Sequence, residues 1–305
     1  KGKNTALSSR ASPICHYTQG FCYWAKRDWE TSYTKFVRAK TILDKDILLR
    51  KDLPKRYVRT LHYAVQCEIE LGKYAKAREH VDQLHDLLNA ADFDAVYIST
   101  LITVSTCRCE LRLLDRKGEY DRAADMEDMV KQAMVHLDDR LPKEYELEFD
   151  LLLSTIHFGA GDPSRSLYWL NKVLNDPEPA LRQDIFTYAR LFNLVVHYEM
   201  GNFELLEYIV RSTQRFLSKR HRAYGVEAAL IEHVKKLARK TSLETKRQLF
   251  ASLHARLEEL MKDPNEEAVL KYFNISAWVE SKLNGVPFAD VVRKAALKPD
   301  AGRTA

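Results

Sequence analysis

Residues 57–88 read YVRTLHYAVQCEIELGKYAKAREHVDQLHDLL, and this stretch decides the fold. Apolar side chains recur at helical spacing on both sides of Gly72, and Ala77 and Val81 begin such a stripe after it. We expect Gly72 to end one helix in a left-handed conformation, and the ring of Tyr74 to pack on the turn. The small Ala77 side chain would let the second helix approach closely. The stretch therefore predicts a helical hairpin.

The same turn recurs along the chain, with an aromatic residue two positions after glycine and a small or aliphatic residue five positions after it. Because one apolar face cannot be buried alone, such hairpins must stack on their neighbours. The further copies are Gly118 with Tyr120 and Ala123, Gly201 with Phe203 and Leu206, a weaker one at Gly161 with Pro163 and Ser166, and one in which Arg27 replaces glycine, with Trp29 and Ser32. Five hairpins are predicted.

The 57–88 stretch resembles a tetratricopeptide repeat (TPR) unit. The matching residues are Ala64, Gly72, Tyr74, Ala77, Val81 and Leu84, the opening unit adds Gly20 in the small first-helix position, and the fourth unit ends in Asp176-Pro177. Residues 186–220 are similar to uncharacterised bacterial TPR-like proteins, a resemblance that supplies no function. The TPR resemblance implies an all-α, right-handed TPR-like α-α superhelix, which is a solenoid of helical hairpins. The turn glycines lie 46, 43 and 40 residues apart, so the repeats are longer than the TPR standard of about 34.

The predicted organisation follows from these turns and from the punctuation beyond them. We expect a frayed tail at 1–12, five TPR-like hairpins at 13–220, C-terminal helices at 221–297 that continue and cap the array, and a tail at 298–305. The C-terminal helices are expected at 222–240, 243–262 and 265–284, with a short one after Pro287. Residues 144–150 alternate like a strand, but Pro142 and the acidic first turn predict a helix there.

Composition supports a helical chain that does not span a membrane. The 305 residues include only 10 Gly and 9 Pro, and no apolar run approaches the length of a membrane span. The five cysteines are odd in number and do not form paired motifs, which is typical of a protein from a reducing compartment. We therefore expect a cytoplasmic protein. Because the sequence begins with Lys1, it leaves open whether an upstream segment or signal peptide was removed. Basic residues predominate in 1–60 and 181–305, and acidic ones in between.

The sequence holds no recognisable catalytic constellation. His80 and His85 are five apart and lie on different helix faces, unlike the i, i+4 pair of a helical zinc site. Cys107 and Cys109 also point to different sides of a helix, and no glycine-rich phosphate loop is present. We therefore expect no enzyme activity, no metal and no cofactor.

Two surfaces are candidates for partner binding. In TPR proteins, positions ten, six and three residues before the turn glycine line the concave face. Carried onto this chain, the contact residues would be Tyr17, Phe21, Trp24, His62, Gln66, Arg108, Arg112 and Tyr198. The sequence leaves open whether Tyr17, Phe21 and Trp24 face a groove or the core, since an apolar i, i+4, i+7 stripe suits both.

The second surface is a basic stripe formed by Arg211, Arg215, Lys219 and Arg222. It is interpreted either as a solvated helix face or as a site for an anionic partner. The anionic candidates are nucleic acid, an acidic protein segment and the acidic middle of another copy of the chain.

The leading hypothesis is a non-enzymatic scaffold whose concave face binds a protein or peptide segment, with the arginines bonding to acidic groups. A nucleic-acid-binding or regulatory helical-repeat protein that uses the basic surface around 211–240 is the first alternative. An enzyme with a site in the groove is the second. No membrane partner is expected, and self-association into a homo-oligomer stays open.

Overall fold

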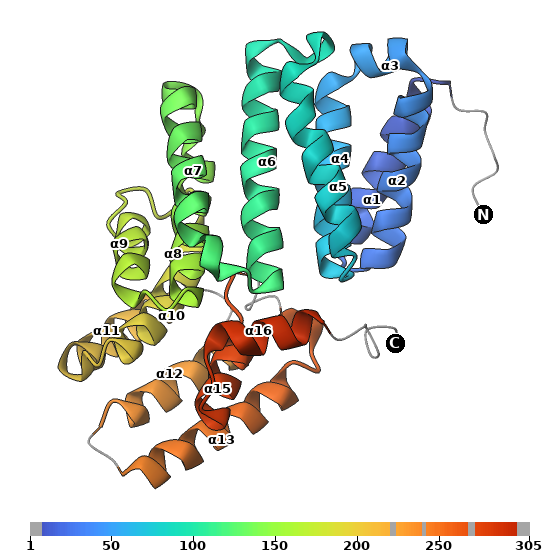
Figure 1. Ribbon diagram of the computed structural model, residues 1–305. Helices are drawn as coiled ribbons and strands as arrows, with labels where there is room; N and C mark the ends of the chain where they lie inside the picture. The colour runs from blue at the N-terminus through green and yellow to red at the C-terminus, as the bar shows by residue number, and fades with distance from the viewer. Residues whose placement is uncertain (1–7, 220–223, 240–241, 268–271, 298–305) are drawn as a thin grey trace. The chain divides into compact units, whose positions relative to one another are not determined.

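The computed structural model describes residues 8–219, 224–239, 242–267 and 272–297, and these residues form helices with no strand among them (Figure 1). The predicted all-α class is confirmed. The tail expected at 298–305 and most of the tail expected at 1–12 lie outside the described residues. The first helix begins at Ala11.

The chain divides into two compact units. The first contains the described part of Lys1–Lys117 together with Asp128–Leu141. Its helices are α1 (Ala11–Ala25), α2 (Trp29–Lys45), α3 (Ile47–Asp52), α4 (Pro54–Glu70), α5 (Tyr74–Asp86) and α6 (Val96–Lys117). Consecutive helices pack side by side, α1 on α2, α2 on α4, α4 on α5, and α6 on both α4 and α5.

The second unit contains Gly118–Glu127 and Pro142–Leu297. Helix α7 (Ala123–Leu137) belongs in part to each unit, so the division falls inside the third expected hairpin. The other helices of the second unit are α8 (Lys143–Gly159), α9 (Pro163–Leu174), α10 (Gln183–Glu199), α11 (Phe203–Leu217), α12 (Gly225–Leu237), α13 (Leu243–Leu260), α14 (Pro264–Glu267), α15 (Ile275–Asn284) and α16 (Phe288–Ala296). Helix α10 packs against α9, α11 and α12.

The predicted turns have the expected backbone conformation. All four turn glycines adopt a positive φ, as does Arg27, which has φ 61° at the position where glycine is replaced. The small or aliphatic residue five positions later is buried in every copy. These buried residues are Ser32, Ala77, Ala123, Ser166 and Leu206.

Close approach between α1 and α2 depends on two small residues. A Cβ atom at Gly20 would lie 2.9 Å from Cε1 of Phe36, which is itself fully buried. The hydroxyl of Ser32 donates a hydrogen bond of 2.9 Å to the carbonyl oxygen of Gly20. Glycine at this position therefore lets the ring of α2 pack directly on the backbone of α1.

The ambiguous segment after Pro142 is helical, as predicted, and forms α8. The helix expected at 265–284 is wrong as a single element, because the described residues place α14 and α15 there as separate helices. The side chain of Asn274 accepts a hydrogen bond from the backbone N–H of Ala277 and so caps a new helix start. The Asn274 cap therefore starts α15 as a helix separate from α14.

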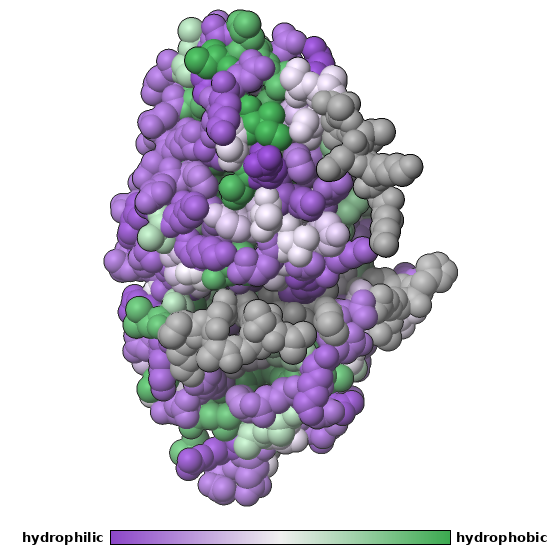
Figure 2. Space-filling model, turned by 90° about the vertical axis from the view of Figure 1, so that its right-hand side faces the viewer, coloured by the Kyte–Doolittle hydropathy of each residue, from purple (hydrophilic) through white to green (hydrophobic). Residues whose placement is uncertain are grey.

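The face of the first unit seen in Figure 2 is largely hydrophilic, with a group of apolar side chains among the polar ones. Figure 2 shows them at the upper end of the molecule, where Figure 1 places α3. Ile47 and Leu48 on α3 are 56% and 78% exposed. Among the described residues, no helix is both long enough and apolar enough to cross a lipid bilayer.

Candidate binding groove on helices α10 and α11

The aromatic residues predicted for the concave face separate into core and surface. Tyr17 is 9% exposed and contacts Phe36 edge-to-face, with 5.6 Å between ring centroids. Phe21 is 41% exposed and stacks on the half-buried ring of Trp24 at 5.9 Å. Tyr63 packs edge-on against both Phe21 and Trp24. Tyr17 thus belongs to the core, whereas Phe21 extends an aromatic cluster to the surface.

His62 and Gln66 face the helix packed beside them. His62 is buried, and its Nδ1 lies 3.4 Å from the Sγ atom of Cys109 on α6. Burial holds the pKa of His62 well below its ordinary value, and the nearby Arg108 guanidinium lowers it further. The amide of half-buried Gln66 also donates to Cys109, at 3.6 Å. His62 and Gln66 thereby join α4 to α6.

The two predicted arginines of α6 have different surroundings. Arg112 is 5% exposed and donates to a carboxylate oxygen of Glu70 at 3.0 Å, and Arg116 donates to the same carboxylate. Arg108 is half-buried, and one of its Nη atoms lies 3.3 Å from Nε2 of His62. The prediction that Arg112 lines the concave face is corrected, because its guanidinium forms an ion pair with the carboxylate of Glu70 inside the unit.

Tyr198, the contact residue predicted in the fifth hairpin, lies in an aromatic cluster of the second unit. Its ring meets Phe250 and Trp278 edge-to-face, each at 5.8 Å between centroids. Burial raises the pKa of the Tyr198 hydroxyl to about 12. The ring therefore contributes to packing between α10 and the C-terminal helices.

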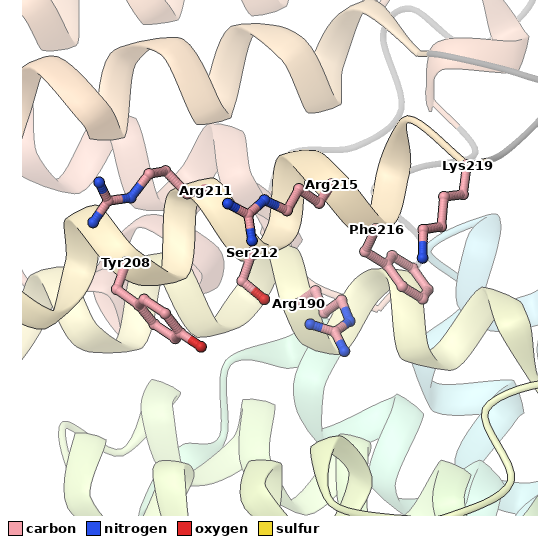
Figure 3. A pocket seen from close by; sticks show the side chains of 7 residues that line it. All are labelled: Arg190, Tyr208, Arg211, Ser212, Arg215, Phe216 and Lys219. Carbon is pink, nitrogen blue, oxygen red and sulfur yellow. The ribbon is translucent and has the colours of Figure 1, made fainter.

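The basic stripe, in contrast, lines a hollow on the second unit. Arg211, Arg215 and Lys219 follow one face of α11 and are exposed, whereas Arg222 lies outside the described residues. The hollow has a volume of about 430 Å³. Its walls are Arg190, Tyr208, Arg211, Ser212, Arg215, Phe216 and Lys219, and Figure 3 shows them together. We call these seven residues the basic groove.

Arg190 is the member of the basic groove that comes from α10. Its guanidinium carbon lies 4.5 Å from the centre of the Phe216 ring, the distance of a cation–π contact. The Nε atom of Arg190 is buried and has no hydrogen-bond acceptor within the described chain. Burial lowers the pKa of Arg190 from its ordinary value. A buried N–H donor without an acceptor lowers the stability of the fold, because the donor has lost its hydrogen bond to water.

The cations of the basic groove form no ion pair with a carboxylate in the described part of the chain, although Glu207 precedes Arg211 by four residues on α11. Glu204, the other acidic residue of α11, also precedes the groove. Other arginines of the chain do have carboxylate partners. Examples are Arg78 with Glu110, Arg112 and Arg116 with Glu70, Arg165 with Glu127, and Arg182 with Asp184. The groove is thus a concentration of uncompensated positive charge.

Sequence reasoning found the stripe on α11 but missed Arg190, Tyr208 and Ser212. Tyr208 and Ser212 follow from helical spacing, because they precede Arg215 by seven and three residues on the same face. Arg190 has a different signal. In an antiparallel hairpin, residues equidistant from the turn lie beside each other, and Arg190 and Ser212 are both eleven residues from Gly201.

A second hollow, of about 920 Å³, lies between the α8–α9 turn and helices α15 and α16. Its lining combines four carboxylates, Asp121, Asp162, Glu199 and Asp290, with the two cations Lys282 and Arg293. Lys282 binds Glu199 at 2.5 Å, and Arg293 binds Asp290 at 3.3 Å. Both cations of this hollow are therefore paired with carboxylates, unlike those of the basic groove, and it has no excess of positive charge.

No protein-family model matches the chain, and no curated protein matches it either. Two surfaces of the described residues are candidates for ligand binding, the basic groove and the aromatic surface at Phe21 and Trp24. The basic groove is the stronger of the two, because excess positive charge and a hollow coincide there.

Proposed function

We propose that the chain is a non-enzymatic scaffold that binds an acidic segment of a partner protein in the basic groove. In this proposal the hairpins belong to a right-handed TPR-like α-α superhelix with long repeats. The left-handed turn residues and the buried small residues after them support that assignment. The cytoplasmic location expected from cysteine usage remains part of the proposal.

The observation that carries the proposal is the set of four cations that share one hollow without carboxylate partners. Bonds from arginine to a carboxylate are charge-assisted and stronger than neutral hydrogen bonds. The excess positive charge also accelerates encounter with an acidic partner. Tyr208, which is 63% exposed, and Phe216 add aromatic surface of the kind that dominates binding energies at interfaces.

The dimensions of the basic groove suit a short extended segment. From Tyr208 to Lys219 the rise along α11 is about 16 Å, at 1.5 Å per residue. An extended chain advances about 3.3 Å per residue, so about five residues of a partner would cover this face. Acidic side chains at alternate positions of such a segment would meet successive cations of α11.

Single-stranded nucleic acid is the second candidate ligand. Aromatic rings interleaved with basic residues stack bases while the cations contact phosphates. The exposed ring of Tyr208, next to Arg211 and Arg215, is the specific observation in its favour. An acidic segment is preferred because Tyr208 is the one exposed ring among the seven residues of the basic groove, whereas Phe216 is half-buried and contacts Arg190.

Phe21 and Trp24 supply a further proposed contact surface on the first unit. Their stacked rings extend from a buried cluster to a position where Phe21 is 41% exposed. We retain the prediction that this aromatic face contacts a protein segment. Phe21→Ala would test it separately from the basic groove, because the two surfaces belong to different units.

Fluorescence anisotropy with two labelled probes tests the main proposal. One probe is a ten-residue peptide rich in aspartate and glutamate, and the other is a ten-nucleotide single strand of mixed sequence. The peptide is expected to bind more tightly than the strand, with an affinity that falls as salt rises. An Arg211→Glu, Arg215→Glu variant should lose binding, whereas an Arg247→Glu, Arg256→Glu control with the same charge change, at exposed positions of α13, should retain it.

Stronger binding of the strand, lost in the groove variant alone, would replace the protein-segment proposal with the nucleic-acid alternative. Binding of neither probe at low salt would overturn both. Equal loss in the groove variant and in the control would mean that net charge, and not the basic groove, attracts the peptide.

A further inference from the structure

We infer that the basic groove recognises a phosphoryl monoester on the bound protein segment, held by Arg190, Ser212 and Arg215. This inference rests on the proposed function, since it assigns the chemistry of one group within the same acidic segment. It would make binding dependent on phosphorylation of the partner.

The three proposed phosphoryl ligands are brought together by the α10–α11 hairpin. Arg190 and Ser212 are equidistant from Gly201 and line the same hollow, and Arg215 follows Ser212 by three residues on the same helix face. Figure 3 shows the hydroxyl of Ser212 between the guanidinium groups of Arg215 and Arg190. Two guanidinium groups from different helices and one hydroxyl therefore border a single position.

The number of donors exceeds what one carboxylate can accept. Each guanidinium carries five N–H donors and the Ser212 hydroxyl adds one, whereas a carboxylate has two oxygens in one plane. A phosphoryl monoester has three terminal oxygens in a tetrahedral arrangement and a charge near −2 at neutral pH. It can accept from two helices at once, so it matches this site better than Asp or Glu does.

The contact between Arg190 and Phe216 gives the site a fixed element. The ring lies against the guanidinium at 4.5 Å, and the Nε atom is buried. A cation held in this way loses little conformational entropy when an anion binds. Arg215 and Lys219 are exposed and can adjust to the phosphoryl group from the open side.

The charged surroundings favour a dianion. The titratable groups of α11 that line the groove are Tyr208, Arg211 and Arg215. The two carboxylates of α11, Glu204 and Glu207, come before the groove in the helix and do not line it. The helices packed against α11 contribute Arg190 from α10 as a lining residue, and no residue of α12 lines the hollow. None of the seven lining residues is a histidine, aspartate or glutamate. A change of affinity between pH 5 and 7.5 would therefore report on ionisation of the ligand.

The test uses three labelled peptides that differ at one central position of the acidic probe. That position holds phosphoserine, glutamate or serine. Binding to the full chain is measured by fluorescence anisotropy at pH 5, 6 and 7.5. We expect the phosphoserine peptide to bind about tenfold more tightly than the glutamate peptide at pH 7.5, the effect of one additional charge-assisted bond. The advantage should shrink toward pH 5, because the second phosphoryl ionisation has a pKa near 6.

Arg190→Lys is the specific variant, because it keeps the charge and removes both the planar fork and the stacking on Phe216. It should abolish the advantage of phosphoserine over glutamate and weaken binding of the glutamate peptide by no more than about threefold, the effect of losing the contact with Phe216. Arg215→Lys, at an exposed position, provides a second variant that does not depend on packing. Arg247→Lys, on α13, is the matched control and should change nothing. Circular dichroism of each variant verifies folding.

Equal binding of the phosphoserine and glutamate peptides would overturn the inference and leave the proposed function standing. Failure of all three peptides to bind would overturn the proposed function itself. Adenosine monophosphate and inorganic phosphate are added as competitors. If either displaces the phosphoserine peptide at concentrations near the peptide's own dissociation constant, the site is one for small phosphate compounds, and the protein-segment assignment is wrong.

Discussion

The guanidinium of Arg190 stacks on the ring of Phe216 at 4.5 Å and joins α10 to α11 inside the basic groove. This contact holds a half-buried cation at the floor of a surface whose other cations are exposed. The hairpin therefore supplies both a fixed charge and adjustable charges. We regard this combination as the physical basis of the proposed binding site.

Replacing Phe216 by leucine tests the role of the ring without altering charge. We expect Phe216→Leu to weaken binding of the acidic peptide about threefold, because Arg190 loses a cation–π contact worth about 0.5–1 kcal/mol. Anisotropy titration at fixed salt measures the change. The same substitution in an Arg190→Lys background should have a smaller effect, and an undiminished effect there would show that the ring acts independently of Arg190.

Gly20→Ala probes the packing of α1 on α2. The new methyl group would lie 2.9 Å from the buried ring of Phe36, so we expect the free energy of unfolding to fall by about 1–3 kcal/mol. Urea denaturation followed by circular dichroism measures it. The exposed Thr18, on the same helix, provides a control, because Thr18→Ala should change stability by no more than about 0.5 kcal/mol. Equal stability of Gly20→Ala and wild type would contradict the described contact.

Arg112→Glu is expected to damage the fold of the first unit and not to act as a clean binding variant. The substitution would place a carboxylate beside Glu70 at a site that is 5% exposed, next to Arg116. We expect a loss of about 3–5 kcal/mol in stability, the usual effect of breaking a buried ion pair. Thermal and urea unfolding measure it. Wild-type stability in this variant would show that Arg112 is available to a ligand after all.

Asp150 is expected to make the protein less stable as pH rises. Burial raises the pKa of its carboxyl to about 7, and Lys172, Lys143, Glu146 and Asp176 contribute smaller effects of both signs. Because the folded pKa exceeds the unfolded value of 3.8, the stabilising protonated form is lost between pH 4 and 7. Asp150→Asn should therefore be more stable than wild type by about 4 kcal/mol at pH 8, and by little at pH 4.

Urea unfolding of wild type and Asp150→Asn at pH 4, 6 and 8 measures the contribution of the Asp150 carboxyl to stability. The two proteins have all other titrating groups in common, so those groups cancel in the difference. A difference that does not grow with pH would mean that the carboxyl is already ionised in the folded protein at low pH.

The turn residues made the helical hairpins predictable from sequence. Arg27 could be placed in a glycine position from its spacing to Trp29 and Ser32, and its positive φ confirms that placement. The basic stripe on α11 was equally predictable, because its residues recur every three or four positions along one continuous stretch of the sequence. These features depend on local geometry, which sequence periodicity records directly.

Features that depend on contacts between helices were beyond the same reasoning. Arg112 looked like a groove residue until the packing of α4 on α6 brought Glu70 to its side chain. Tyr17 could be assigned to the core only when its contact with Phe36 was known. The role of Arg190 likewise requires the pairing of α10 with α11 and not the sequence of either helix alone.

The most direct test of the account is an NMR titration that follows the side-chain Nε–Hε resonances of the arginines while the acidic peptide is added. The account predicts shifts for Arg190, Arg211 and Arg215, and none for Arg112 and Arg116, which are paired with Glu70. Binding of the peptide with unchanged resonances for Arg190, Arg211 and Arg215 would contradict the assignment of the basic groove as the binding site.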